Sequence, residues 1–494
     1  MRELIQIHPA DNVAVALRSL APGENVSCGG RKLSLNEPVP AGHKLALEEI
    51  SEGETVRKYG MPIGFARRRI CAGEWVHTHN LRSGLEGVED FSYRPSFQEL
   101  SPAEPAFFQG YARPEGRAGV RNEVWILPTV GCVNGVAKRL EQLAAAEAPA
   151  GVEGVFAFQH SFGCSQLGED LGMTRRLLCG LAQNPNAGGV LVLGLGCENN
   201  RMQDMRQELA GADPRRVKFL SCQECEDEIS AGMALLRELM AFAAGAVRQP
   251  CPLSQLTVGL KCGGSDGFSG ITANPLAGAF SDWLLSRGGS ALLTEVPEMF
   301  GAEPLLLRRC RSEGVYRRAV DLLQGFRGYF LRHGQRVDEN PSPGNREGGV
   351  TTLAEKSLGC VQKSGSAPVE DVLLYGETVR CRGLSLLQAP GNDLTSACAL
   401  AAAGAQLILF TTGRGTPFGC PVPTIKIASN SLLAEKKKNW IDFDAGRLLE
   451  GVSQETLLQE LARLVLAAAS GTVRAKSEQL DKSVLSIWKD GVTL

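Results

Sequence analysis

Three cysteines of this sequence each follow a glycine just after an apolar segment that is typical of a buried strand. They are Cys132, Cys164 and Cys197. In open α/β sheets, ligands bind outside the carboxyl ends of the strands, and neighbouring strands lie about 4.8 Å apart. Thiols at one sheet edge can therefore converge on iron, an iron–sulfur cluster or zinc. The sequence predicts a metal site at these cysteines. The alternative is that they are small buried residues that fill space between loop and sheet.

Three of the six histidines stand where they can transfer protons. His77 and His79 are two residues apart at the end of a predicted strand, so both imidazoles face the same side. Such a pair can bind a metal or exchange protons near neutral pH. The alternative is a solvated strand end. His160 lies between a predicted strand and Cys164 and is a candidate general acid or base, with a hydrogen-bonded packing residue as the alternative.

Polar loops follow several predicted strands in the last third of the chain. The candidate substrate-binding residues in these loops are Gly263, Ser265, Asp266, Asn392, Asp393 and Arg414. A guanidinium group binds a carboxylate, and the other side chains suit hydroxyl groups, so the set fits a polyhydroxylated acid. Glu295 follows another of these strands and is a candidate for proton transfer. Each loop alone is ordinary turn chemistry; their joint placement at one sheet edge carries the prediction.

The elements that must position these residues divide the chain into four parts. Residues 1–90 show short alternating runs between turn signals, which predicts an all-β module. Residues 91–121 are rich in proline and predict a linker. Apolar strands then alternate with amphipathic helices in two α/β units, 122–250 and 251–494. This pattern predicts parallel sheets covered on both faces. A Gly/Pro/Ser-rich segment, 340–368, interrupts the second unit.

Composition excludes several classes of function. Among 494 residues, 52 Lys and Arg balance 54 Asp and Glu, so the concentrated positive charge that nucleic acid or an anionic membrane requires is missing. No apolar run reaches the ~18 residues of a membrane span, and the first residues lack an apolar signal core. We therefore expect a cytoplasmic protein whose fifteen cysteines are reduced. Neither a GxxxxGK[ST] loop nor a complete GxGxxG fingerprint is present.

Several ordered motifs resemble those of the altronate/galactarate dehydratase family. They are 130–135 (VGCVNG), 163–168 (GCSQLG), 194–200 (GLGCENN), 262–274 (CGGSDGFSGITAN), 293–303 (LTEVPEMFGAE), 357–363 (SLGCVQK) and 412–417 (TGRGTP). The resemblance runs essentially from end to end. It implies an N-terminal β-clip module of the SAF type, a middle domain with dimer contacts and a C-terminal Rossmann-like parallel sheet. It also implies a homodimer that dehydrates D-altronate to 2-dehydro-3-deoxy-D-gluconate with ferrous iron, in hexuronate breakdown.

The residues themselves leave alternatives open. A dehydratase acting on galactarate, or a related lyase on a sulfonated hydroxy acid, needs the same kinds of side chain. An oxidoreductase could use the α/β units to hold a dinucleotide, although the glycine fingerprint is incomplete. A non-catalytic sugar-acid binding or assembly protein is a third class. Iron, likewise, is either a single ion on ligands in the last unit or part of a cluster on the cysteines.

Overall fold

The N-terminal module consists of short antiparallel strands. The computed structural model describes residues 3–85 and 92–493, so the expected boundary at residue 90 lies outside the described residues. The strands are β1 (Leu4–Ile5), β2 (Val13–Ala16), β3 (Asn25–Cys28), β4 (Arg31–Ser34), β5 (Lys44–Ala46), β6 (Thr55–Lys58), β7 (Met61–Ala66), β8 (Trp75–Val76) and β9 (Leu81–Arg82). They form sheets β1-β2-β5-β8 and β6-β7-β9 and the hairpin β3-β4. The predicted all-β module is confirmed.

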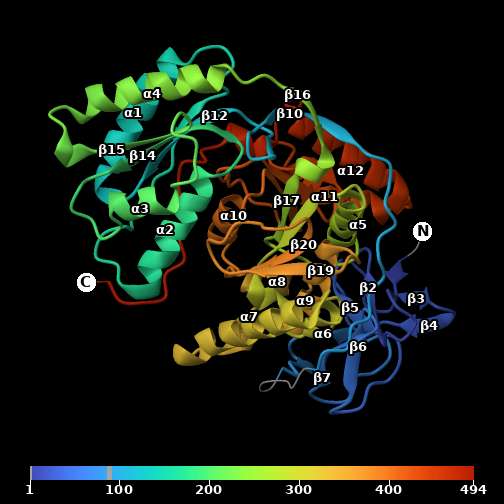
Figure 1. Cartoon of the computed structure of the whole chain (residues 1–494). Coiled ribbons are helices and arrows are strands. Elements are labelled where there is room, and N and C mark those ends of the chain that lie inside the picture. Colours follow the sequence, from blue (N-terminus) through green and yellow to red (C-terminus); the bar gives the residue numbers. More distant parts are fainter. Residues whose placement is uncertain (1–2, 86–91, 494) are drawn as a thin grey trace.

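The middle domain is a four-stranded parallel sheet of order β13-β12-β14-β15. Its elements are β12 (Glu123–Pro128), α1 (Asn134–Glu147), β13 (Val155–Ala157), α2 (Gly168–Ala182), β14 (Ala187–Gly194), α3 (Met202–Glu208), β15 (Val217–Ser221) and α4 (Glu228–Ala244). Helices α1 and α4 cover one face, and α2 and α3 lie on the other (Figure 1). Strand β14 is buried along its whole length, as a sheet covered on both faces requires.

The segment expected as a linker is not irregular throughout. It contains β10 (Phe107–Ala112) and β11 (Ala118–Gly119), which form an antiparallel sheet with β16 (Gln249–Pro252). Two prolines in β16 hid this strand from sequence reasoning, because proline cannot donate to a strand ladder. Strand β16 is tolerated because it lies at the edge of the sheet, in the order β11-β10-β16.

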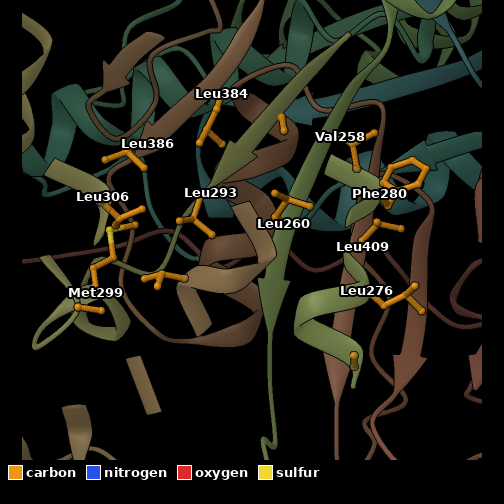
Figure 2. Packing of buried hydrophobic residues seen from close by; sticks show 14 of the residues in the cluster. Val258, Leu260, Leu276, Phe280, Leu293, Met299, Leu306, Leu384, Leu386 and Leu409 are labelled. Atoms are coloured by element: carbon orange, nitrogen blue, oxygen red, sulfur yellow. The ribbon is translucent and has the colours of Figure 1, made fainter. Parts of the chain in front are cut away.

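The C-terminal domain is built on a seven-stranded parallel sheet of order β19-β20-β18-β17-β21-β22-β23. Its strands are β17 (Thr257–Cys262), β18 (Ser290–Leu293), β19 (Val369–Leu373), β20 (Gly383–Leu387), β21 (Leu407–Thr412), β22 (Thr424–Ala428) and β23 (Phe443–Asp444). Its helices are α5 (Ala273–Leu285), α6 (Glu303–Leu307), α7 (Glu313–Arg332), α8 (Pro343–Glu347), α9 (Leu353–Cys360), α10 (Asp393–Ala402), α11 (Ser431–Lys436) and α12 (Gln454–Ala469). Figure 2 shows the packing of Leu260, Leu293 and Leu409 from three neighbouring strands in its core.

The Gly/Pro/Ser-rich segment 340–368 folds into structure rather than a long loop. Helices α8 and α9 lie within it, followed by a 3-10 turn at Val361–Ser364. Capping side chains explain why short helices form here, since Ser342 caps α8 and Thr352 caps α9. The turn residues of this segment predict a loop, whereas its capping residues allow two short helices.

No helix in the described residues is long and apolar enough to cross a membrane.

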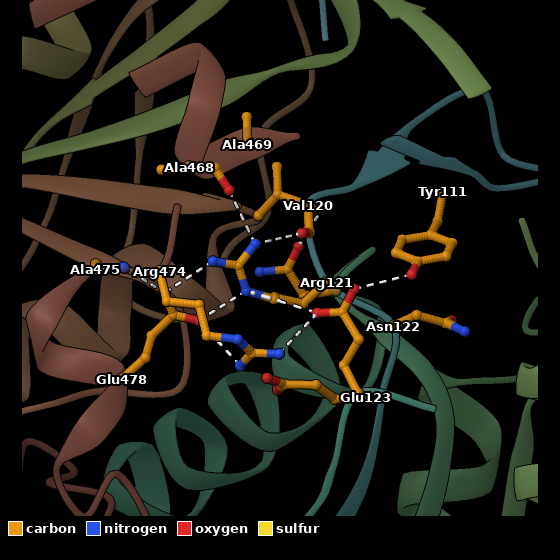
Figure 3. A network of polar contacts seen from close by, with 12 residues as sticks. Tyr111, Val120, Arg121, Asn122, Glu123, Ala468, Ala469, Arg474, Ala475 and Glu478 are labelled. Atoms are coloured by element: carbon orange, nitrogen blue, oxygen red, sulfur yellow. Dashed lines mark hydrogen bonds and ion pairs between the residues drawn. The ribbon is translucent and has the colours of Figure 1, made fainter. Parts of the chain in front are cut away.

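A buried arginine joins the middle domain to the C-terminal part of the chain (Figure 3). Arg121 is 1% exposed and donates to both carboxylate oxygens of Glu478, each at 2.7 Å. It also donates to the carbonyl oxygens of Val120 at 2.7 Å and Ala468 at 2.9 Å. A planar guanidinium can satisfy both carboxylate and carbonyl acceptors at once, so this residue fixes α12 against the start of the middle domain.

We predict that Arg121→Met destabilises the protein by ~3–5 kcal/mol, because the Glu478 carboxylate is left buried without its partner. Urea unfolding followed by circular dichroism measures the loss. The double variant Arg121→Met/Glu478→Met removes both charges and should recover most of it. Equal stability of the Arg121→Met variant and the unchanged protein would contradict the role assigned to this pair.

Candidate active site

The carboxyl edge of the seven-stranded sheet gathers polar residues at a topological switch point. Strand β17 is central, the chain passes from it to β18 and then to the outer strands β19 and β20, and it returns to pair β21 on the other side of β17. Ligands of open α/β sheets bind at such a reversal. Cys262 ends β17, Glu295 follows β18 and Arg414 follows β21. The structure therefore confirms that these distant segments share one edge.

Two thiols and a carboxylate meet there out of contact with solvent. The Sγ atoms of Cys262 and Cys360 are 3.3 Å apart, and Glu298 Oε2 lies 3.1 Å from the first and 3.0 Å from the second. Cys262 comes from β17, Glu298 from the turn after β18 and Cys360 from the end of α9. All three are buried. Hydrogen bonding to Cys262 and burial raise the pKa of Cys360 well above its usual value.

Two buried lysines contact this cluster. Lys363 Nζ is 2.9 Å from Cys262 Sγ, and Lys356 Nζ is 2.6 Å from Glu298 Oε1. Burial alone would raise the pKa of Glu298, but the two ammonium groups outweigh it and lower that pKa to about 2. Burial opposes the charge of Lys363, yet Cys262 and Cys360 hold its pKa above the usual range. Glu298 is therefore a carboxylate and Lys363 an ammonium at neutral pH.

A third lysine links two further carboxylates. Lys261 Nζ lies 3.0 Å from Glu295 Oε1 and 2.9 Å from Asp393 Oδ1. Burial raises the pKa of Glu295, with Lys261 opposing. Asp393 is 38% exposed, whereas Glu295 is 1% exposed. Gly263 permits the close approach of Asp393, because a Cβ atom there would lie 2.5 Å from its Oδ2. These contacts form a line of groups from the interior to the surface.

The charges of the site balance in a way that fits a divalent metal ion. Three ammonium groups contact three carboxylates. The ammonium groups are those of Lys261, Lys356 and Lys363, and the carboxylates are those of Glu295, Glu298 and Asp393. The net charge of these groups is zero while the two thiols are protonated. A divalent cation that displaces two thiol protons keeps this balance. The ligand atoms of Cys262, Glu298 and Cys360 lie within 4.8 Å of one another, and thiolates with a carboxylate suit iron or zinc. The residues present therefore fit a metal.

Two hydroxyl groups beside the cluster have no hydrogen-bond partner. Ser265 Oγ, in the loop after Cys262, and Ser357 Oγ, one turn before Cys360 on α9, are both buried and unsatisfied. Buried polar groups without a partner are uncommon in folded proteins. They are suited to bind the hydroxyl groups of a ligand or an ordered water molecule. Arg414 is half-exposed at the rim and contacts Glu347 Oε2 at 3.2 Å.

Other predicted binding residues hold the loops in place. Asp266 accepts hydrogen bonds from Ser269 and Ser429, each at 2.8 Å, and from Asn430 at 3.0 Å. Burial raises its pKa, with these donors opposing. Asn392 caps α10 by accepting from the Thr395 backbone N–H at 3.0 Å. Both side chains are occupied by structural contacts, so direct substrate contact for them stays a prediction.

His77 of the N-terminal module contacts the main chain of α8. His77 is 3.0 Å from the Arg346 carbonyl oxygen, and its ring stacks on Trp75 with centroids 5.0 Å apart. Burial lowers the pKa of His77 to about 4, so the imidazole is neutral near pH 7. His79 is exposed, and its ring lies 5.4 Å from that of Trp75. Glu37, Glu74 and His79 form another group of three ligand atoms within 4.8 Å. Within the part of the chain that the structure describes, neither His77 nor His79 contacts the thiol–carboxylate cluster.

The N-terminal module is fastened to the site helix by buried ion pairs. Lys44 of β5 and Lys58 of β6 each lie 2.9 Å from Glu355 of α9. Burial opposes ionisation, but the two lysines hold the pKa of Glu355 far below its usual value. Glu355 directly precedes Lys356 and lies five residues before Cys360. The module therefore fixes the helix that supplies these two groups (Figure 1).

The structure places His160 and the three glycine-linked cysteines on the other parallel sheet. His160 is buried, and its ring contacts the Pro128 carbonyl oxygen at 2.8 Å and the Phe162 N–H at 3.1 Å. Burial lowers its pKa. Cys132, Cys164 and Cys197 are free and exposed at the carboxyl edge of the middle sheet, so the alternative that they fill buried space is wrong.

Sequence reasoning missed the lysines and the acid at the centre of the site. Lys261 interrupts an otherwise apolar strand, and a lysine inside such a run is a signal of a buried ion pair. Glu298 and Cys360 lie in segments already singled out for other reasons, but nothing in their spacing places them beside Cys262. Lys356 and Lys363 lie in the Gly/Pro/Ser-rich segment 340–368, which interrupts the predicted strands.

Fold and site together define a multidomain α/β protein with a metal-ligand cluster at the switch point of a parallel sheet. The chain belongs to the D-galactarate/altronate dehydratase family. Residues 2–84 match its SAF domain, 110–244 its second domain and 253–493 its C-terminal domain.

Curated relatives agree with this membership over the full length. The chain is 51% identical over 498 residues to the altronate dehydratase of Bacillus subtilis (strain 168), and 51% identical over 496 residues to that of Escherichia coli (strain K12); both alignments cover 100% of each chain. It is 33% identical over 502 residues to the galactarate dehydratase (L-threo-forming) of Escherichia coli (strain K12), covering 96% of this chain and 94% of that protein.

We predict that Glu355→Gln loosens the N-terminal module, because Lys44 and Lys58 are then buried without a carboxylate. Breaking a buried pair in this way costs ~3–5 kcal/mol. Hydrogen exchange of β5 and β6 should accelerate, while exchange in the middle sheet should not change. Glu52→Gln, an exposed change in the same module, is the control. Unchanged exchange in β5 and β6 of the Glu355→Gln variant would refute the fastening role.

We predict that His77 makes the protein less stable as the pH falls from about 6.5 to about 4. The unfolded histidine binds a proton near pH 6.5, whereas the folded one binds it only near pH 4, so the unfolded state holds more protons between these values. Urea midpoints at pH 7 and pH 5 should differ less in His77→Gln than in the unchanged protein. The exposed His79→Gln variant should keep the full difference. If His77→Gln keeps it too, the assignment is wrong.

Proposed function

We propose that this protein is a hydro-lyase that removes water from D-altronate to give 2-dehydro-3-deoxy-D-gluconate in hexuronate catabolism. The observation that carries the proposal is the buried cluster of Cys262, Glu298 and Cys360 with its three lysines at the switch point of the sheet. The 51% identity to altronate dehydratases over the whole chain supports the choice of substrate. Galactarate is the second candidate substrate, supported by 33% identity over 96% of the chain.

We propose ferrous iron as the metal at Cys262, Glu298 and Cys360. When bound, such an ion supplies a Lewis acid that stabilises negative charge on a substrate oxygen. Soft thiolate ligands favour iron over magnesium or calcium. Lys363 and Lys356 then add positive charge around the same region, because each contacts one of the ligands. Developing negative charge in the reaction is stabilised by such fixed groups in a water-poor site.

The reaction breaks the C2–H and C3–O bonds of the substrate and forms a C2–C3 double bond; the resulting enol becomes the 2-keto product. A base must take the C2 proton, and an acid must protonate the leaving hydroxyl group. We assign the proton transfers to the line formed by Asp393, Lys261 and Glu295. Asp393 is the most exposed of the three, while Glu295 is buried behind it and burial raises its pKa.

Substrate recognition follows from the groups around this line. We assign Arg414 to pair with the carboxylate of the sugar acid. We assign the unsatisfied hydroxyls of Ser265 and Ser357 to bind its hydroxyl groups. A substrate that lacks the matching hydroxyl group leaves the buried polar group of the protein without a hydrogen bond. Such a substrate is therefore strongly disfavoured. These contacts are the basis on which altronate and galactarate would be distinguished.

The assembly and compartment of the protein complete the proposal. Apolar side chains are exposed at Leu167 beside α2 and at Val484 and Val492 of the C-terminal tail. The tail pairs with the middle domain through Gln159 and Gln166, so this apolar surface supports a homodimer formed through the middle domain. Fifteen free cysteines suit a reducing compartment, which supports a cytoplasmic location. Size-exclusion chromatography with light scattering tests the dimer.

The activity is tested by incubating reduced, iron-supplied protein with altronate and, separately, with galactarate. Formation of the 2-keto-3-deoxy acid is followed by its reaction with a carbonyl reagent. Faster turnover of altronate is expected. Turnover of galactarate alone would move the assignment to the second candidate, and turnover of neither substrate would refute the hydro-lyase proposal.

We predict that Asp393→Asn lowers kcat at least ~10²-fold, because the accessible proton acceptor is lost. Exchange of the C2 proton with solvent deuterium, followed by NMR, should fall in parallel. Asp321→Asn, an exposed change on α7, should retain both. Full C2–H exchange in the Asp393→Asn variant would show that another group takes the proton.

A further inference from the structure

We propose that Cys132, Cys164 and Cys197 bind an iron–sulfur cluster at the carboxyl edge of the middle sheet. This site lies on a different sheet from Cys262, Glu298 and Cys360, and the dehydratase reaction proposed above does not use it. Three free thiols come from the ends of three neighbouring strands, in the order β13-β12-β14. Free cysteine is usually buried, so three exposed ones at a single sheet edge call for an explanation.

The loops that carry the cysteines are locked to one another. The Gly131 N–H donates to the Phe162 carbonyl oxygen at 2.9 Å, which joins the β12 loop to the β13 loop. The Asn200 N–H donates to the Gly163 carbonyl oxygen at 2.9 Å, and the Ser165 N–H donates to Asn199 Oδ1 at 2.9 Å. The loops after β13 and β14 therefore contact each other across the end of β12, which brings the three cysteine-bearing loops together.

The residues on both sides of Cys164 have positive φ angles. Gly163 has a φ of 101°, and a Cβ atom there would lie 2.0 Å from the Thr129 carbonyl oxygen. Ser165 has a φ of 58°, although it is not glycine. Among the described residues, the other non-glycine residues with positive φ are Tyr59 and Glu295. Glu295 belongs to the candidate active site, and Tyr59 is beside Lys58, which binds Glu355. Such strain persists mainly at functional sites.

The separation of the three thiols does not suit a single ion bound by all of them. One tetrahedral metal with sulfur ligands at about 2.3 Å needs its sulfurs about 3.8 Å apart. The three cysteines do not form a group of ligand atoms within 4.8 Å of one another. In a cluster, iron and sulfide atoms lie between the cysteine sulfurs and hold them further apart, and cysteine thiolates are the usual ligands.

The groups beside these thiols favour sulfur as the ligand at this edge. Glu198 lies beside Cys197, but its carboxylate already accepts from Thr129 Oγ1 at 2.5 Å and from the Gly196 N–H at 2.6 Å. Cys222, at the end of β15, is half-buried, and burial raises its pKa to about 11. A surface pocket beside Cys197 is lined by Arg175 and Arg201, and both arginines pair with Asp204 in the same pocket.

The test uses the full-length protein, reconstituted without oxygen with ferrous iron, sulfide and a thiol reductant, then desalted. Bound iron, acid-labile sulfide, visible absorption and the electron paramagnetic resonance spectrum after reduction are measured. We expect bound sulfide, with iron and sulfide in equal amounts once the single ferrous ion proposed at Cys262, Glu298 and Cys360 is subtracted. Each of Cys132→Ser, Cys164→Ser and Cys197→Ser should lose most of the sulfide and the cluster spectrum while keeping the circular dichroism of the unchanged protein.

Matched controls separate this site from other thiols. Cys71→Ser and Cys381→Ser remove exposed cysteines elsewhere and should keep the cluster, as should Cys360→Ser. Absence of sulfide from the reconstituted protein, a single zinc or iron ion without sulfide, or equal loss in Cys71→Ser would overturn the proposal. Loss in Cys360→Ser but not in Cys164→Ser would place the cluster at the other site. None of these readouts depends on altronate turnover, so failure of the dehydratase assay leaves the result interpretable.

Discussion

The burial of three lysines against three carboxylates at one sheet edge is the constraint on which the rest of this structure depends. Lys261 and Lys363 are buried and the Lys356 side chain is 9% exposed, and each is compensated by an acid or a thiol from a different segment. A buried charge without its partner costs several kcal/mol. The strand ends, α9 and the turn after β18 must therefore come together, or none of these lysines can be buried.

The same requirement explains why the N-terminal module belongs to the site without adding a side chain to the metal cluster. Its Lys44 and Lys58 are compensated by Glu355, so the module docks where α9 presents that carboxylate. Because α9 also carries Lys356 and Cys360, the docking and the chemistry share one short helix. The contacts of His77 with the main chain of α8 extend this support to the rim that carries Arg414 and its neighbour Glu347.

The two parallel sheets present different chemistry at equivalent edges. In the C-terminal domain, thiols, acids and lysines are buried together, and the proton-transfer groups lead from the interior to the surface. In the middle domain, thiols stand exposed on loops held by backbone hydrogen bonds, and the nearby acid Glu198 is already satisfied. The first arrangement suits acid–base chemistry around a single ion. The second suits a sulfur-ligated group that sits at the surface.

Local patterns in the sequence were enough to predict the all-β module and both parallel sheets, because periodicity indicates which face of an element is buried. They also predicted the strand ends that carry Cys132, Cys164, Cys197, Glu295 and Arg414. They were not enough for β16, whose prolines disguise an edge strand, or for α8 and α9, whose caps lie among turn residues. Which strand end meets which was decided by tertiary structure alone. Cys262, Glu298 and Cys360 are separated by 36 and 62 residues along the chain, and only strand order and the compensation of buried charge bring them into contact.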